Sequence, residues 1–269
     1  MHIFITLAVI ASAAIIIPSA YIAITQSSQV YIPGHTITAT PKDIGLKFHD
    51  LSLTTSDNIA IKAWFTPTDD SAAANTILFC HGNAGDIGDR VELVQTLHKL
   101  GFNSLCFDYR GFGESGGKPS ETGTEMDAMA AWQYLTEKRN IPAGKIIIYG
   151  RSLGGAVASQ LASVTTPKAL VIESTFASIP AMAHFRYPLL PMTFLCRFKY
   201  DNIQTIPKVN APILVAHSRT DSVCPYEQGR HVYDAAGQPK QFVEIKGDHG
   251  DGGLITNPDY QTAFVKFCR

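Results

Sequence analysis

The feature that most restricts the fold of this 269-residue chain is a series of six short apolar runs separated by helix-like segments. The runs are NTILFCH (75–81), FNSLCFDY (102–109), KIIIYG (145–150), KALVIES (168–174), PILVAHS (212–218) and KQFVEIKG (240–247). Apolar residues at helical spacing between the runs are Ile87, Val91, Val94 and Leu97, then Ala128, Trp132 and Leu135. Near-continuous apolar strands that alternate with helices indicate a parallel sheet covered on both faces.

A hairpin and a lid complete the predicted fold. LKFHDLSLTT (46–55) and IAIKAWFTP (59–67) alternate in polarity and are rich in β-forming residues, which predicts an antiparallel hairpin. Residues 174–211 show no strand pattern, and their apolar, proline-rich composition predicts an ordered lid. The expected class is therefore α/β. It is a single domain over residues 44–269 with a mostly parallel sheet, helices on both faces, an N-terminal hairpin and a short lid.

The N-terminal stretch IFITLAVIASAAIIIPSAYIAI (3–24) carries no charged side chain. As a helix it would reach roughly 30 Å, the thickness of the hydrocarbon core of a bilayer. Pro18 is tolerated in a membrane helix. We therefore expect a transmembrane anchor, a single-pass membrane protein, and a polar connector over residues 25–43.

Two alternatives to the anchor remain open. A cleaved signal peptide needs a basic start and small residues at its cleavage site, and the sequence provides neither clearly. A buried helix of a soluble domain is the other alternative. No Lys or Arg precedes Lys42, so the sequence does not tell on which side of a membrane the domain would lie.

Charge and cysteine content exclude several function classes. The formal net charge is −1 and no long basic run is present, so nucleic-acid binding has no electrostatic support. The five cysteines show no metal-ligand spacing, and their odd number argues against a disulfide framework. We expect no metal, no cofactor and no nucleic-acid partner, and the sequence does not address the oligomeric state.

A serine stands between two glycines in Gly-Arg-Ser-Leu-Gly, residues 150–154. The pentapeptide follows an apolar run and precedes the helix-like LGGAVASQLAS (153–163). A G-x-S-x-G pattern between strand and helix is typical of a nucleophile elbow. The chain turns sharply there, so the flanking positions must be small, and the helix N-terminus adds N–H groups beside the hydroxyl. We predict that Ser152 is a nucleophile; the alternative is an ordinary glycine-containing turn.

A serine nucleophile needs a base, and the base needs an acid that orients it. In enzymes with such an elbow, the acid and then the base follow the serine on loops after later strands. Asp221 follows PILVAHS and His249 follows KQFVEIKG, so both are placed at the carboxyl ends of strands. We therefore predict a catalytic triad of Ser152, Asp221 and His249.

Other residues compete for these two roles. His217 lies within a strand run and is expected to pack in the core. His231 is expected on an exposed helix after Pro225. Asp248 and Asp251 stand too close to the predicted base in sequence to hold its far ring nitrogen, so they are the less favoured acids.

The oxyanion of such a reaction needs two N–H donors. The backbone of Leu153, directly after the nucleophile, is one expected donor. The backbone of Asn83 is the other, because FCHGNAGD (79–86) is a strand that turns into a helix. The glycine-rich loop 107–121 lacks the Lys-Ser/Thr end of a phosphate-binding loop and is expected to shape the site wall. Within it, Asp108 and Arg110 are expected to form a structural ion pair.

Taken together, these motifs resemble the alpha/beta-hydrolase superfamily. The motifs are HGNAG (81–85), DYRGFGES (108–115), GRSLGG (150–155), ESTFASIP (173–180), SRTDSVCP (218–225) and GDHGDG (247–252). The most similar subgroup is the membrane-anchored hydrolase-domain proteins of the bud-emergence type, which are similar to serine aminopeptidase-like hydrolases. The resemblance spans about residues 44–269 and implies the triad and the oxyanion donors named above. One departure is visible: the subgroup often has Asn-Asp after the catalytic histidine, and this chain has Gly250-Asp251.

The expected function is that of a membrane-anchored serine hydrolase which cleaves acyl ester or thioester bonds through an acyl-enzyme. The apolar lid favours a lipid-like or small acyl substrate, with Phe176, Arg186 and Phe194 as candidate contacts. An aminopeptidase for short peptides is one alternative, but it would need a lid carboxylate for the free amine, and only Asp201 and Glu173 lie near. A non-catalytic, membrane-tethered scaffold is the other alternative, and a missing triad member would favour it.

Overall fold

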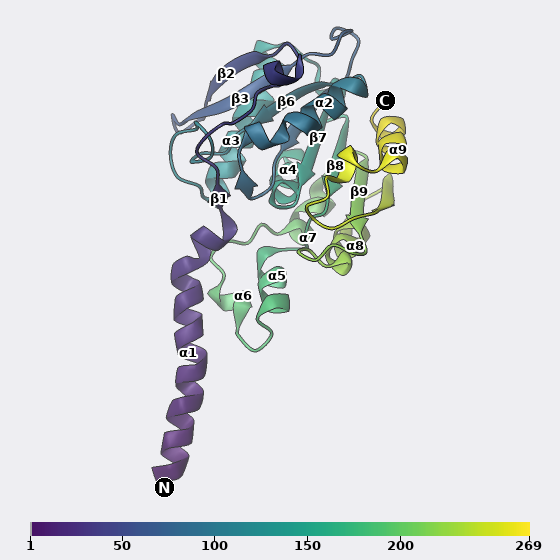
Figure 1. Ribbon diagram of the computed structural model, residues 1–269. Helices are drawn as coiled ribbons and strands as arrows, with labels where there is room; N and C mark the ends of the chain where they lie inside the picture. Colours follow the sequence, from purple (N-terminus) through teal and green to yellow (C-terminus); the bar gives the residue numbers. More distant parts are fainter. Residues whose placement is uncertain (1) are drawn as a thin grey trace.

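The protein forms one eight-stranded sheet in a computed structural model that describes residues 2–269, apart from the side chains of residues 2, 3 and 7–15. The strand order is β10-β9-β8-β7-β4-β6-β3-β2 (Figure 1). These strands are β2 (His49–Thr54), β3 (Ala60–Thr66), β4 (Thr76–Cys80), β6 (Asn103–Phe107), β7 (Ile146–Arg151), β8 (Ala169–Glu173), β9 (Ile213–Ser218) and β10 (Lys240–Ile245). Six of them are parallel, while β3 runs antiparallel to β6 and β2 antiparallel to β3. The predicted mixed sheet and its hairpin are confirmed.

Helices connect the strands and cover both faces of the sheet (Figure 1). The α-helices are α1 (His2–Val30), α2 (Val91–Lys99), α3 (Glu121–Gln133), α4 (Leu153–Ser163), α5 (Ile179–Arg186), α6 (Met192–Leu195), α7 (Asn202–Thr205), α8 (Tyr226–Ala235) and α9 (Pro258–Cys268). Short 3-10 turns lie at Pro41–Ile44, Ile87–Arg90, Ala143–Lys145, Ile206–Lys208 and Gly253–Ile255, and a π turn at Tyr134–Lys138 extends α3.

The core consists of two layers because successive side chains of each buried strand point to opposite faces. In β7, Ile146 and Ile148 pack with α3, α4 and α8 on one face. Ile147 and Tyr149 pack with α2 and α9 on the other face. Because β4, β7, β8, β9 and β10 are parallel, the loops at their carboxyl ends lie at the same edge of the sheet.

The N-terminal helix α1 runs the length of the predicted anchor, residues 3–24, and extends away from the sheet domain (Figure 1). The side chains of residues 3 and 7–15 lie outside the described residues. Within the described part of the chain, no helix is long and apolar enough to cross a membrane. The structure therefore does not support the predicted transmembrane anchor.

The second half of α1 contacts the segment that was predicted to be a lid. Ile22 packs against Met192 and Cys196. The Gln26 side chain donates to the carbonyl of Leu195 over 2.8 Å and accepts from the backbone of residue 197 over 2.7 Å. The segment 174–211 itself contains α5, α6, α7 and a 3-10 turn and no strand, as the sequence predicted. The predicted connector 25–43 is partly structured, because α1 continues to Val30.

Candidate active site

Ser152 occupies a sharp turn between β7 and α4. Its backbone has φ 54° and ψ −122°, a conformation that costs a non-glycine residue on the order of 1–3 kcal/mol and is typical of functional sites. A Cβ at Gly150 would lie 2.2 Å from the carbonyl oxygen of Gly154. A Cβ at Gly154 would lie 2.0 Å from the carbonyl oxygen of Cys80 on the neighbouring strand. Both glycines are therefore required by the close packing of helix on strand.

We expect Gly154→Ala to lower the free energy of unfolding by about 2–3 kcal/mol, because the new methyl group meets backbone atoms that cannot give way. Gly144→Ala is the matched control, since nothing lies within 4 Å of a Cβ built at that position. Urea denaturation of both variants measures the difference. Equal destabilisation of the two variants would contradict the packing argument.

The structure brings the three predicted triad residues together. The Ser152 Oγ lies 3.1 Å from Nε2 of His249, and Nδ1 of the same ring lies 2.8 Å from Oδ2 of Asp221. The three residues come from loops after β7, β9 and β10. This chain of hydrogen bonds allows the imidazole to take a proton from the serine while the carboxylate fixes the ring orientation.

Asp221 is buried, yet it is held as a carboxylate. Burial by itself raises its pKa, but hydrogen bonds from the imidazole and from two backbone N–H groups outweigh burial, so the pKa lies below its ordinary value. The backbone donors are Val223 at 3.0 Å and Cys224 at 2.7 Å, both to Oδ1. The acid is therefore charged at neutral pH and fixed in place.

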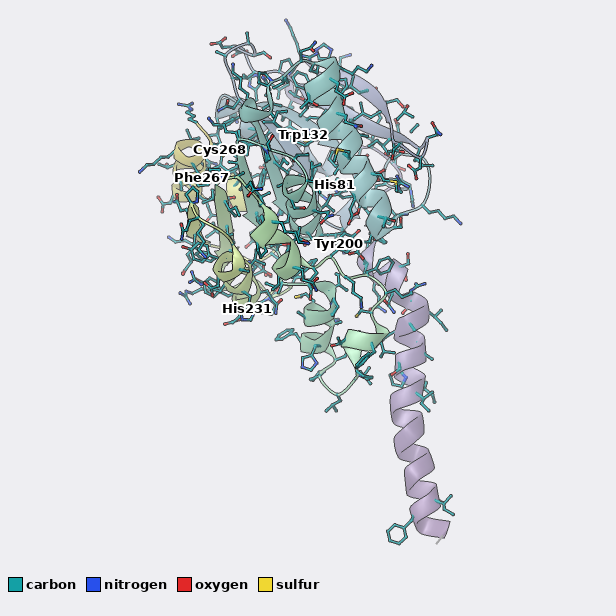
Figure 2. All side chains as sticks on the ribbon, turned by 180° about the vertical axis from the view of Figure 1, so that it is seen from behind. His81, Trp132, Tyr200, His231, Phe267 and Cys268 are labelled. Atoms are coloured by element: carbon teal, nitrogen blue, oxygen red, sulfur yellow. The ribbon has the colours of Figure 1, made fainter. Side chains whose placement is uncertain are left out.

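None of the competing residues replaces Asp221 or His249 in this hydrogen-bonded series. His217 is fully buried in β9, burial lowers its pKa, and its Nε2 lies 2.8 Å from the carbonyl of Cys224. His231 lies on α8 at the edge of the domain (Figure 2) and is exposed, as predicted. Asp248 accepts from the backbone and hydroxyl of residue 222 over 2.7 and 2.8 Å. Asp251 accepts from the backbone of residue 248 over 2.7 Å, so neither acid holds the triad imidazole.

The two predicted oxyanion donors both lie near the serine. Leu153 is the first residue of α4, so its N–H has no acceptor within the helix. Asn83 lines the same cavity as Ser152. Its carbonyl accepts from Ile32 over 2.8 Å, because β1 (Ile32–Pro33) pairs with β5 (Ala84–Gly85). The segment after α1 therefore holds the loop that carries Asn83, a contact which the sequence did not predict.

A buried carboxylate connects the elbow to the histidine loop, a role that was not predicted from the sequence. Glu173, at the end of β8, accepts from the Tyr149 hydroxyl over 2.5 Å and from the Leu254 N–H over 3.2 Å. It also pairs with Arg151 over 3.1 Å. The guanidinium of Arg151 in turn donates to the carbonyl of His249. Arg151, the residue beside Ser152, thus fixes the loop that carries His249.

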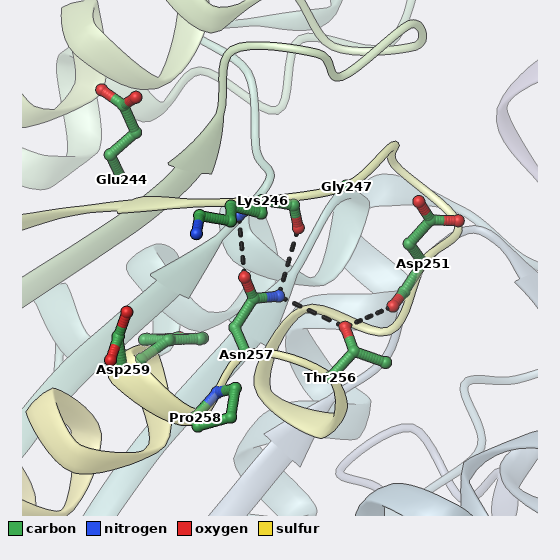
Figure 3. Close-up of a pocket in the computed structure, with 9 residues that line it drawn as sticks. Glu244, Lys246, Gly247, Asp251, Thr256, Asn257, Pro258 and Asp259 are labelled. Atoms are coloured by element: carbon green, nitrogen blue, oxygen red, sulfur yellow. Dashed lines mark hydrogen bonds between the residues drawn. The ribbon is translucent and has the colours of Figure 1, made fainter.

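Asn257 fixes the far end of the same loop. Figure 3 shows its side-chain amide between the two arms of the loop, at the wall of a surface cavity. Its Oδ1 accepts from the backbone of Lys246 over 2.8 Å. Its Nδ2 donates to the carbonyls of Lys246 and Gly253 and to the Thr256 hydroxyl. That hydroxyl donates to the carbonyl of Asp251 over 2.6 Å.

We expect Asn257→Ala to lower the free energy of unfolding by about 2 kcal/mol, because it leaves buried backbone groups without partners. We also expect kcat/KM on an ester to fall at least about tenfold, because small displacements of a catalytic group are costly. Thr262→Ala is the control, since Thr262 is exposed and bonds only within α9. An Asn257→Ala protein with full stability and activity would show that the amide does not fix the loop.

The lid candidates are not part of the cavity beside the serine. Phe176 is buried in the main core, while Arg186 is exposed and Phe194 is 89% exposed. None of the three is among the described residues that line the cavity. The predicted substrate contacts of the lid are therefore not placed beside Ser152.

The prediction that Asp108 and Arg110 form an ion pair is wrong. Arg110 pairs with Asp57 over 2.7 Å and with Asp127 over 2.9 Å. Asp108 instead accepts from the backbone of Ile87 over 2.9 Å and so supports the turn into α2. Arg110 reaches carboxylates that are distant in sequence, which is why sequence neighbourhood misled the prediction.

Comparisons with known sequences identify relatives over most of the chain. A family model described as alpha/beta hydrolase fold matches residues 75–195. The alpha/beta hydrolase domain-containing protein WAV2 of Arabidopsis thaliana is 32% identical over 267 residues, which cover 90% of this chain and 87% of the relative. Protein bem46 of Schizosaccharomyces pombe is 30% identical over 84% of this chain and 75% of its own length. An uncharacterized protein of Mycobacterium tuberculosis is 37% identical over 77% and 74%.

Solved structures with the same fold are also found. The Pyrococcus furiosus esterase Pf2001 superimposes with a TM-score of 0.72 at 19% identity, covering 88% of this chain and 96% of that chain. The esterase domain of a Rhodothermus marinus protein gives a TM-score of 0.59 at 23% identity, covering 81% and 94%. At these identities the likeness concerns the fold.

Proposed function

Because the chain belongs to the alpha/beta-hydrolase superfamily, we propose that it is a serine hydrolase that cleaves acyl ester or thioester bonds. The observation that carries the proposal is the hydrogen-bonded series from Ser152 through His249 to Asp221, with distances of 3.1 and 2.8 Å. Its position on a strained elbow adds support, since such turns expose a hydroxyl for attack. The esterases among its structural neighbours are consistent with the same chemistry.

In the first half of the proposed reaction, Nε2 of His249 takes the proton of Ser152 as Oγ attacks the acyl carbon. The carbonyl π electrons move to oxygen, and the N–H groups of Asn83 and Leu153 stabilise the resulting oxyanion. The bond to the leaving alcohol or thiol then breaks, and the imidazolium returns the proton to it. An acyl-enzyme on Ser152 remains.

In the second half, His249 takes a proton from water, and the hydroxide attacks the acyl carbon. The oxyanion forms again between the same two donors. Collapse releases the carboxylic acid, and the imidazolium returns its proton to the serine oxygen. Asp221 stays a carboxylate throughout and stabilises the imidazolium. No step requires a metal or an organic cofactor.

The two acids considered for an aminopeptidase are occupied. Glu173 is fully buried among its tyrosine, arginine and backbone partners. Asp201 caps α7 by accepting from the backbone and side chain of Gln204 over 3.0 and 2.9 Å. Neither observation favours recognition of a free amine, so the ester or thioester is the better supported substrate.

Hydrolysis of p-nitrophenyl esters of increasing acyl length by the purified protein tests the proposal. We expect saturable release of p-nitrophenol and, after acid quenching, the mass of one acyl group on a peptide that contains Ser152. A folded protein that hydrolyses neither esters nor acyl thioesters would overturn the proposal.

A further inference from the structure

Two arginines line the cavity beside Ser152. It has a volume of about 240 Å³ and is lined by Gly82, Asn83, Ala84, Arg90, Arg151, Ser152, His249 and Gly250. Two of these eight described residues are arginines, and none is a carboxylate. A cavity that held only a neutral acyl group would need no such pair of cations.

The charge of Arg151 is already balanced. Its guanidinium pairs with the buried Glu173 over 3.1 Å and donates to the carbonyl of His249. It is therefore used to hold the histidine loop. The charge of Arg151 is therefore less available to a ligand than the charge of an unpaired arginine.

Arg90 is different, because its guanidinium has no ion-pair partner among the residues that the structure describes. It stands at the start of α2, and its Nη2 donates to the carbonyl of Ala84. Its Nε is buried and has no hydrogen-bond partner among the described residues. Among the described residues, no carboxylate oxygen lies within 4.0 Å of the guanidinium nitrogens of Arg90. The carboxylates of Asp86, Asp89 and Asp108 lie farther from it than this.

The surroundings of Arg90 favour the binding of an anion beside its guanidinium. Burial lowers its pKa most, and Asp89 opposes that effect. The positive charge of Arg151 lowers the pKa further, while Asp108 and Asp86 oppose it, and the net pKa lies below the ordinary value. A partly buried cation without a paired anion is costly unless a ligand supplies the missing charge. A guanidinium also presents donors in a planar fork that matches a carboxylate or a phosphate.

We propose that Arg90 binds an anionic group of the substrate, a carboxylate or a phosphate, in the cavity beside Ser152. The inference rests on the proposed hydrolase function and makes it more specific: the acyl substrate carries a negative charge close to the bond that is cleaved. The lining residues also include the oxyanion loop and the base, so the anion would lie within a few bonds of the scissile carbonyl.

Two pairs of esters test where the charge is recognised. The first pair compares the p-nitrophenyl monoester of glutaric acid with p-nitrophenyl hexanoate, which places the charge on the acyl part. The second compares 4-acetoxybenzoate with 4-acetoxybenzamide, which places it on the leaving group. The measured quantity is the ratio of kcat/KM for the anionic ester to that for its neutral partner, so intrinsic reactivity cancels between variants.

We expect Arg90→Gln to lower this ratio in one of the two pairs by about tenfold to a hundredfold, the range for losing a charged hydrogen bond. Arg90→Lys, which keeps the charge but not the fork, should lie between. Arg186→Gln is the control, because it removes an exposed lid cation outside the cavity, and it should leave the ratio within about twofold. Unchanged ratios in Arg90→Gln, or equal changes in Arg186→Gln, would overturn the proposal.

A binding measurement separates this proposal from the hydrolase function. Ser152→Ala protein is titrated with glutarate and with inorganic phosphate by calorimetry, and the double variant Ser152→Ala/Arg90→Gln is treated identically. We expect saturable binding of one of the two anions in the first protein and a loss of at least about tenfold in affinity in the second. Anion binding without ester hydrolysis would overturn the hydrolase function alone. Hydrolysis without anion binding or discrimination would overturn the anion site alone.

Discussion

Replacement of Ser152 by alanine is expected to lower kcat on any ester substrate by about 10⁴- to 10⁶-fold, because it removes the atom that forms the acyl-enzyme. The backbone of the elbow can remain as it is, since alanine is no larger than serine. The variant should therefore stay folded and bind substrate. The measurement is p-nitrophenol release at saturating substrate, with thermal unfolding recorded for both proteins.

Ser163→Ala is the matched control for this replacement. Ser163 lies at the end of the same helix, and its hydroxyl bonds only to the carbonyl of Gln160. Its loss should leave kcat within about twofold. A Ser152→Ala protein that keeps more than a small fraction of wild-type activity would show that another group attacks the substrate.

Replacement of Asp221 by asparagine is expected to lower kcat by about 10³- to 10⁴-fold. The carboxylate oxygen that accepts from Nδ1 of His249 over 2.8 Å would become an amide that either donates or accepts. The imidazole then loses the tautomer that takes the serine proton, and the imidazolium loses its nearby negative charge. Single-turnover kinetics with a p-nitrophenyl ester would locate the loss in the acylation step.

Asp248→Asn is the comparison that decides between the two candidate acids. Asp248 lies next to the base in sequence but bonds to the backbone and hydroxyl of Ser222. Its replacement removes one support of the loop, so a loss of less than about tenfold is expected. A larger loss for Asp248→Asn than for Asp221→Asn would reverse the assignment of the acid.

The sequence predicted those parts of the fold that depend on local pattern. The six apolar runs correspond to β4 and β6–β10 to within two residues at each end. Five of these strands are buried along almost their whole length and are therefore apolar, whereas the edge strand β10 is buried only at Ile245. The elbow was equally visible, since a turn that brings helix and strand into contact at Gly150 and Gly154 excludes any side chain there. Asp221 and His249 followed from their positions after later strands.

The supports of the site were not predictable, because they join residues that are distant in sequence. Glu173 appeared to stand at the entry of the lid, yet β8 directs it into a buried network with Tyr149 and Arg151. Arg110 was expected to pair with its near neighbour in sequence, but it pairs instead with Asp57 and Asp127. Such pairings follow from the order of strands in the sheet, which no single segment of the sequence encodes.

The pairing of β1 with β5 could not be predicted from the sequence for a different reason. Each strand has only two residues, and the pairing joins Ile32 to Ala84 through backbone atoms alone. No pattern of side chains marks a contact of this kind. The lid segment was only partly predictable. Its composition correctly indicated an ordered segment, but Phe194 is exposed and Phe176 packs in the core, and neither lines the cavity.

The central claim is that Ser152 is an activated nucleophile, and labelling with a fluorophosphonate probe tests it most directly. Such a probe reacts with a serine whose proton is taken by a neighbouring base. We predict that the wild-type protein is labelled once, on the peptide that contains Ser152, that Ser152→Ala is not labelled, and that Asp221→Asn is labelled far more slowly. A folded wild-type protein that remains unlabelled, or a Ser152→Ala protein that is labelled as well as wild type, would contradict the account.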